Sequence, residues 1–95
     1  MEKTYKTEEV GEEYLAAIDR AIEIRKNRRP IYGDSFLQEN DFNILAIIDG
    51  KRNRLGVLLK NQGIVTKDKI LDEILDILNY YAFLFAIKQK EFENA

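Results

Sequence analysis

Hydrophobic residues recur every three or four positions along most of this chain, and the pattern predicts helices. An α-helix turns once in about 3.6 residues, so side chains at this spacing share one face. The spacing predicts helices at about residues 7–28, 41–61 and 66–90, with a structured loop at 30–40. No segment requires a strand. The predicted fold is all-α, a single domain over residues 1–95 with three main helices in a bundle.

The first predicted helix carries one apolar stripe, which the pattern predicts to be buried. Its members are Val10, Tyr14, Leu15, Ala17, Ile18, Ala21 and Ile22. A basic run follows, from Arg25 to Arg29, at a helix end where the helix dipole favours cations. Pro30 is expected to end the helix, because proline lacks an amide donor and restricts the residue before it.

The segment from Pro30 to Asn40 is rich in turn-forming residues but also carries apolar side chains. Its large apolar side chains are those of Ile31, Tyr32, Phe36 and Leu37. Loops rarely carry so much apolar surface without a role. The loop either folds back over the core, or Tyr32 and Phe36 help to wall a ligand pocket.

The second and third helices are expected to begin at the N-caps Asp41 and Thr66, whose side chains can accept amide hydrogen bonds. The second helix has a stripe of isoleucine and leucine residues that Lys51 interrupts, so Lys51 is predicted to lie at the edge of the core.

The third helix combines an apolar face with an acidic edge. The predicted face consists of Ile70, Ile74, Ile77, Leu78, Tyr81, Leu84 and Phe85. Glu73 and Asp76 lie one turn apart at its border. One alternative is that they form the solvent-exposed polar side of an amphipathic helix. The other is that they share a hard cation such as Mg²⁺, which takes oxygen ligands and keeps several waters.

Part of the third helix is more apolar than a three-helix monomer requires. From Tyr80 to Ile87 the segment is apolar on every side, whereas a monomer would cover about one side of it. The surplus predicts that oligomerisation completes the bundle, as a homodimer or a dimer of dimers.

Composition narrows the chemistry that the chain can perform. The 95 residues contain neither cysteine nor histidine, which excludes disulfides, thiolate or imidazole metal ligands and histidine-based catalysis.

The formal net charge of −2 argues against nucleic-acid binding, although Arg25 to Arg29 and Arg52 to Arg54 are local basic runs. No signal-peptide pattern or membrane-length apolar run is present, so a soluble, cytoplasmic protein without a membrane partner is expected.

Three motifs in order resemble one known family. YGDSF at 32–36, KxxRL at 51–55 and DEILDILNY at 72–80 resemble the nucleotide modification-associated domain 1 family, which is common in phage-linked genes. That family is similar to the all-α nucleoside triphosphate pyrophosphohydrolases, the MazG and dimeric dUTPase group. The resemblance covers about residues 31–86 and implies a MazG-like bundle.

The resemblance also implies a site. In the pyrophosphohydrolases an ExxE pair and an ExxD pair on successive helices hold Mg²⁺, which organises a triphosphate for attack by water. Glu73 and Asp76 match the second pair as metal-binding and catalytic residues. Asn79 and Tyr80 follow where the family has its asparagine–tyrosine, and the resemblance implies a catalytic role for Asn79 as well. The first pair is replaced, because Lys51 and Arg54 stand at the ExxE positions.

This replacement leaves two interpretations open. In one, Glu73 and Asp76 hold a single Mg²⁺, Lys51 and Arg54 bind phosphate, and Tyr32 and Tyr80 stack on a base. The chain would then bind a nucleotide or modified nucleotide, and hydrolyse it to a monophosphate and pyrophosphate or bind it without fast turnover. In the other, Lys51 and Arg54 pair with Asp72, Glu73 or Asp76, and the chain is a non-catalytic helical oligomerisation module.

Overall fold

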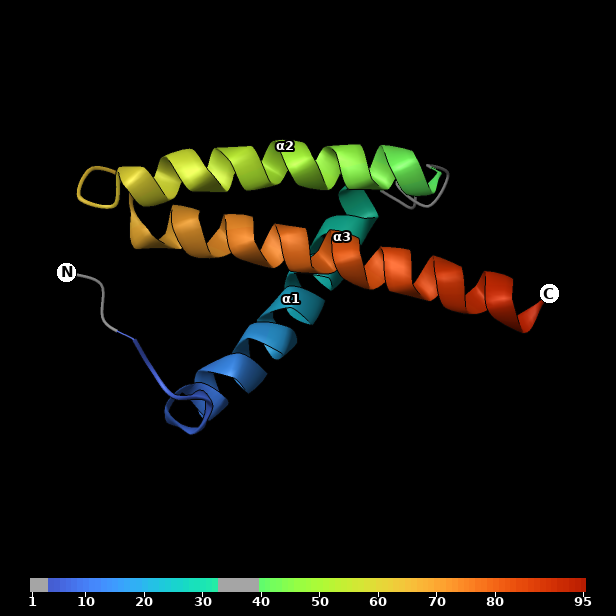
Figure 1. The fold of residues 1–95 in the computed structure, drawn as a ribbon, viewed down its shortest axis with the longest axis horizontal. Helices are drawn as coiled ribbons and strands as arrows, with labels where there is room; N and C mark the ends of the chain where they lie inside the picture. The colour runs from blue at the N-terminus through green and yellow to red at the C-terminus, as the bar shows by residue number, and fades with distance from the viewer. Residues whose placement is uncertain (1–3, 33–39) are drawn as a thin grey trace.

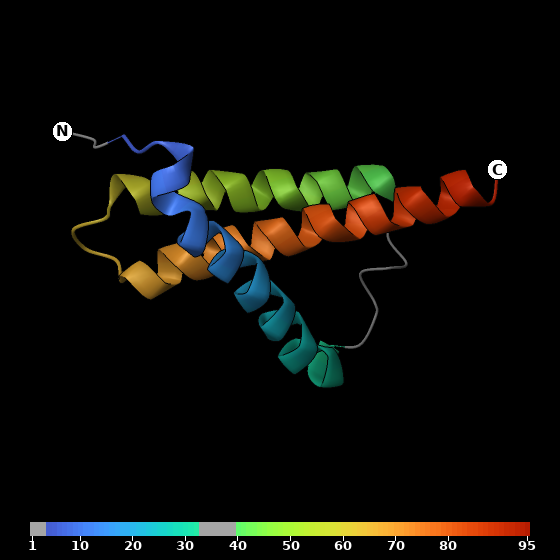
Figure 2. The same cartoon turned by 90° about the horizontal axis from the view of Figure 1, so that it is seen from below.

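The computed structural model describes residues 4–32 and 40–95, except for the side chains of residues 28–32. Within these ranges the chain forms a short 3₁₀ helix, Thr7–Val10, and the α-helices α1 (Gly11–Tyr32), α2 (Asp41–Lys60) and α3 (Lys67–Glu93). Helices α2 and α3 lie side by side in opposite directions, and α1 crosses α3 obliquely (Figures 1 and 2). The prediction of an all-α fold with three main helices is confirmed. The loop residues Phe36 and Leu37 lie outside the described residues.

Polar side chains cap the starts of α2 and α3. Thr66 caps α3 as predicted, and its hydroxyl accepts a hydrogen bond from the backbone N–H of Lys69 at 3.3 Å. The cap of α2 is Asn40 rather than Asp41, because the Asn40 side-chain oxygen accepts from the N–H of Asn43 at 2.9 Å. Asp41 is instead the first residue of the helix, where the dipole favours an acidic side chain.

Helix α1 runs through Pro30 to Tyr32, so the prediction that Pro30 ends it is wrong. A proline near the end of a helix removes one amide donor, while the amides before it still bond to their carbonyls. The start also differs from the prediction. The segment from Thr7 opens as a 3₁₀ turn, and the α-helix begins only at Gly11.

Few apolar side chains are fully buried. Among the described residues the buried hydrophobic side chains are Ala21, Ile44, Ile48, Leu58 and Leu75. Helix α2 supplies three of them, whereas α1 supplies only Ala21. The core therefore lies between α2 and α3, and α1 touches it at one narrow crossing.

The predicted burial of the whole α1 stripe is wrong. Ile18 and Ile22 are 37% and 49% exposed, and Tyr14 and Leu15 are more exposed still. An oblique crossing covers only the residues at the crossing point, so side chains that share a face with Ala21 extend beyond the contact. Periodicity shows which residues share a face, but it does not show how much of that face is covered.

The apolar face predicted for α3 is divided in the same way. Ile70, Ile77 and Leu84 are half-buried on the side of α3 that contacts α2. Other members of the predicted face, among them Leu78 and Phe85, are exposed. None of the helices in the described ranges is long and apolar enough to cross a lipid bilayer.

Lys88 ties the end of α3 to the start of α2. Its ammonium lies 2.5 Å from a carboxylate oxygen of Asp41 and 2.7 Å from one of Glu91. The hydrogen bond to Asp41, followed by the hydrogen bond to Glu91, raises the pKa of Lys88 above its ordinary value of 10.5. Folding therefore favours the protonated form of Lys88.

The contribution of Lys88 to stability is expected to disappear in strong alkali. Because the folded-state pKa is raised, the contribution is complete below about pH 10.5 and is lost as the pH rises through the raised value. Lys88→Met should thus be less stable than wild type in urea unfolding at pH 7 and 9, with the difference shrinking above pH 11. Lys90→Met is the control, because the wild-type Lys90 ammonium lies 3.9 Å from Glu93, too far for a hydrogen bond. The stability of this variant should differ little from that of the wild type at any pH. A Lys88→Met difference that persisted unchanged into strong alkali would contradict this assignment.

Candidate functional site

The charged residues that the sequence singled out on α2 and α3 lie together. Lys51 of α2 faces Asp76 of α3, with its ammonium 2.5 Å from a carboxylate oxygen. The two side chains are 18% and 20% exposed, so this ion pair is largely shielded from water. Each charge neutralises the other within the interface between the helices.

A second, looser pair lies one turn away. The Arg54 guanidinium lies 3.9 Å from Glu73 Oε1, a distance too long for a hydrogen bond. Arg54 is 64% exposed, whereas Glu73 is only 13% exposed. Glu73 Oε1 is shielded from solvent and has no hydrogen-bond donor among the described residues. We refer to Lys51, Arg54, Glu73 and Asp76 as the α2–α3 cluster.

Tyr80 borders the α2–α3 cluster. The Lys51 ammonium lies 5.4 Å from the centre of the Tyr80 ring, within the range of a cation–π interaction. Lys51 is therefore held by both a carboxylate and an aromatic face. Tyr32, the other residue predicted to stack on a base, is the last residue of α1, and its side chain lies outside the described part of the structure.

Asn79 contacts α1. Its side-chain amide donates a hydrogen bond to the backbone carbonyl of Ala21 at 3.1 Å. This bond fixes the crossing of α1 on α3 at its most buried point. The catalytic role that the resemblance implies for Asn79 stays a prediction, and the observed contact gives this side chain a positioning role.

Two contacts of α1 with α3 were not predicted from the sequence. Arg20 lies 3.5 Å from Asp72 Oδ1, an oxygen that is shielded from solvent and accepts no hydrogen bond among the described residues. The Arg25 guanidinium lies 4.8 Å from the centre of the Phe83 ring. The sequence gives no signal for such pairs, because residues far apart in the chain meet only through the crossing angle of the helices.

Glu73 and Asp76 do not form a metal cage with other acidic side chains. Within the described residues, no group of three or more Asp or Glu side chains gathers closely enough to hold a metal ion. Glu73 has a shielded oxygen that a cation could use, whereas Asp76 already binds the Lys51 ammonium. The described residues therefore supply at most one carboxylate, Glu73, that is not already held close by a cation, and Mg²⁺ binding stays a prediction.

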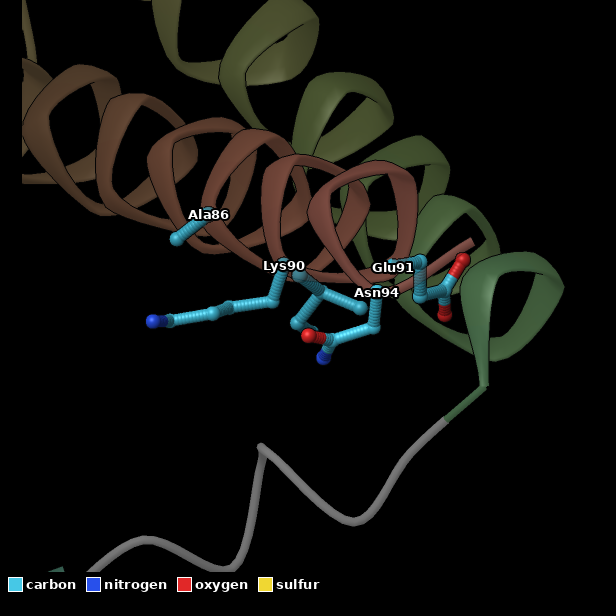
Figure 3. A pocket seen from close by; sticks show the side chains of 5 residues that line it. Ala86, Lys90, Glu91 and Asn94 are labelled. Atoms are coloured by element: carbon cyan, nitrogen blue, oxygen red, sulfur yellow. The ribbon is translucent and has the colours of Figure 1, made fainter.

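An open depression of about 390 Å³ lies elsewhere, along the last turns of α3. Figure 3 shows Ala86, Lys90, Glu91 and Asn94 projecting around it. Its lining residues, among those that the structure describes, come from the end of α3. It contains no member of the α2–α3 cluster.

Comparison with known proteins adds no assignment. No protein-family model, no curated protein and no solved structure matches the chain.

Proposed function

We propose that this chain binds a nucleotide through the α2–α3 cluster, with slow or no turnover. Arg54 would contact the phosphate groups, since a guanidinium can donate two parallel hydrogen bonds to phosphate oxygens. Tyr80, beside Lys51, would offer a ring on which a base can stack. The motif resemblance and the proximity of these residues point to the same ligand class.

One observation carries the proposal: a shielded Glu73 oxygen without a hydrogen bond lies beside an exposed Arg54. Leaving a buried carboxylate oxygen without a hydrogen bond costs about 1–3 kcal/mol, so such an atom calls for an explanation. A ligand that brings a cation or a donor to Glu73 supplies one. Arg54 is exposed enough to turn from Glu73 toward a phosphate without breaking a close hydrogen bond.

Magnesium enters this proposal together with the phosphates. A Mg²⁺ ion commonly binds through one or two carboxylates plus substrate phosphate oxygens, and it would neutralise the phosphate charge next to Glu73. The chain offers two carboxylates here, and Lys51 holds one of them. Because the ExxE pair of the pyrophosphohydrolases is absent, we expect binding to exceed hydrolysis.

Thermal unfolding tests this proposal. A ligand that binds only the folded state stabilises it by about 2.7 kcal/mol at a concentration of 100 times Kd, which corresponds to roughly 10 °C or more in a domain of this size. The chain should be unfolded in the presence of each common NTP and dNTP, with and without millimolar Mg²⁺. At least one nucleotide should raise Tm.

Arg54→Ala should abolish the Tm response, and Arg52→Ala should keep it. Arg52 is a matched control on the same helix, exposed and paired only loosely with Asp49 at 3.8 Å. If no nucleotide shifts Tm, or if the two variants respond equally, the proposed binding site is wrong. Pyrophosphate release measured on the same samples reports turnover separately.

A non-catalytic helical module is the second candidate, favoured by the shielded Lys51–Asp76 pair. Two charges that already neutralise each other need neither metal nor phosphate. This alternative expects a stable oligomer with no nucleotide response. It also expects that Glu73→Gln, which removes the charge beside Arg54, leaves stability unchanged or raised.

Nucleic-acid binding receives less support. Arg25 contacts an aromatic ring, Arg52 lies near Asp49, and Arg54 lies near Glu73. Each of these three arginines therefore lies beside a partner within the chain, whereas the side chains of Arg28 and Arg29 lie outside the described part of the structure.

A further inference from the structure

The α2–α3 cluster has two cations, and they differ in how firmly they are held. The Lys51 ammonium lies 2.5 Å from Asp76 in a largely shielded pair. Arg54 is 64% exposed and lies 3.9 Å from Glu73, so it is the cation that can turn toward a ligand. One guanidinium binds one phosphate group with two parallel hydrogen bonds. A chain of two or three phosphate groups therefore needs a second cation, and α1 carries one close by.

Arg20 and Asp72 repeat the arrangement of Arg54 and Glu73. Asp72 and Glu73 are successive residues of α3, and each has a carboxylate oxygen that is shielded from solvent and accepts no hydrogen bond within the described residues. Arg20 lies 3.5 Å from the Asp72 oxygen, as Arg54 lies 3.9 Å from the Glu73 oxygen. Arg20 is 60% exposed. Neither guanidinium is fixed by a hydrogen bond to its shielded oxygen, so each is able to leave it.

The direction of α1 decides which way Arg20 projects. Helices α1 and α2 both pack on α3 (Figures 1 and 2). The contacts between α1 and α3 follow the same order along both helices, from Arg20–Asp72 to Arg25–Phe83. The two helices therefore run in the same general direction.

Arg20 lies on the side of α1 that is nearer to α2. On α3, the right-handed step of about 100° from Asp72 to Glu73 leads from the contact with α1 to the contact with α2. Helix α1 faces α3, so on α1 the turn toward α2 has the opposite sense. Ala21 is the buried residue at the crossing, and the residue before it, Arg20, lies toward α2. Arg20 and Arg54 thus border the same side of α3, at the same level.

We propose that Arg20 is a second phosphate-contacting residue, and that a chain of phosphate groups lies between Arg20 and Arg54. This role rests on the proposed function, since it adds a residue from α1 to the same site. One phosphate group binds Arg54 and the next binds Arg20, whereas a single phosphate group uses one of the two. Asp72 is 47% exposed, so water replaces the guanidinium there when Arg20 turns to the ligand. Arg20 lies outside residues 31–86, so the motif resemblance does not imply this role.

Inorganic tripolyphosphate is the probe that tests this contact, because it offers phosphate groups without a base. Its binding is measured by isothermal titration calorimetry in EDTA, so that no metal ion takes part. The wild-type chain should bind tripolyphosphate at least about tenfold more tightly than inorganic phosphate. Arg20→Ala should remove most of this difference, weakening tripolyphosphate binding by about tenfold or more while leaving that of inorganic phosphate unchanged. Arg20→Lys keeps the charge without the planar fork and should recover part of the loss.

Lys26→Ala is the matched control, since Lys26 is an exposed cation of α1 that lies about 120° around the helix from Arg20. Its tripolyphosphate affinity should stay within about twofold of the wild type, because salt screens distant exposed charges. Thermal unfolding of Arg20→Ala should resemble that of the wild type, since exposed ion pairs contribute little to stability.

Three results would overturn the role of Arg20. They are no tripolyphosphate binding by the wild type, equal binding by wild type and Arg20→Ala, and equal losses in Arg20→Ala and Lys26→Ala, which would mean attraction by net charge alone. Failure of the proposed function looks different. If tripolyphosphate binds through Arg20 but no nucleotide raises Tm, the phosphate contacts stand and nucleotide binding is wrong. If nucleotides raise Tm equally in wild type and Arg20→Ala, nucleotide binding stands and the role of Arg20 is wrong.

Discussion

The Lys51→Met variant is expected to be about 2–3 kcal/mol less stable than the wild-type chain in urea unfolding at pH 7. The substitution removes the ammonium that lies 2.5 Å from Asp76, whose side chain is only 20% exposed. A shielded carboxylate that loses a close cation is less well stabilised, because water reaches it poorly. The pair is partly accessible to water, so the effect should lie below that of a fully buried ion pair.

The double variant Lys51→Met/Asp76→Leu separates the cost of a lost partner from the value of the pair itself. It should recover most of the stability that either single change loses, because two apolar side chains of similar size need no neutralisation. Arg52→Met is the control, since Arg52 and Asp49 are 66% and 71% exposed, and its effect should stay within about 0.5 kcal/mol. Near-neutral single variants would mean that the Lys51–Asp76 pair does not hold the helices together.

The Ile48→Ala variant is expected to lose about 2–5 kcal/mol, measured by the same urea unfolding. Ile48 is 0% exposed and is one of the buried side chains of α2, with Ile44 and Leu58. Removing its outer carbons leaves a cavity. Because few side chains around it are fully buried, few can shift to fill that cavity. Native proteins are stable by only about 5–15 kcal/mol in total, so this loss is a large part of the stability of the chain.

Ile48→Val provides the graded version of this test and should cost about 0.5–1.5 kcal/mol. Val57→Ala removes apolar atoms from the exposed side of the same helix, where no cavity forms, and should cost less than about 0.5 kcal/mol. If Val57→Ala and Ile48→Ala destabilised the chain equally, the core would not lie where the structure places it.

The helical fold could be predicted from sequence because its signals are local. The cap at Thr66 and the spacing of Ile44, Ile48 and Leu58 depend on neighbours a few residues away. The prediction that Pro30 ends the first helix is wrong because the rule that proline ends a helix describes the helix interior better than its last turn. The prediction that Ile22 is buried is wrong because its burial depends on the angle at which α1 crosses α3, a helix distant in sequence.

The candidate site was predicted only in part. Charge and spacing drew attention to Lys51, Arg54, Glu73 and Asp76, and these residues do meet across α2 and α3. The sequence left open whether the cations would pair with the acids. Lys51 pairs closely and Arg54 does not, a difference set by their depth in the interface, which residue types cannot reveal.

The short connection between α2 and α3 has a consequence for how the chain folds. Asn61 closes the end of α2, with its backbone N–H bonded to the carbonyl of Leu58 and its side chain to that of Val57, and α3 begins at Lys67. Contacts between α2 and α3 therefore close short loops of the chain. Closing a short loop costs less conformational entropy than closing a long one, so these contacts form quickly during folding. Helix α1, whose described residues include one buried side chain, Ala21, should dock late on a preformed α2–α3 hairpin and leave first when the native state opens locally.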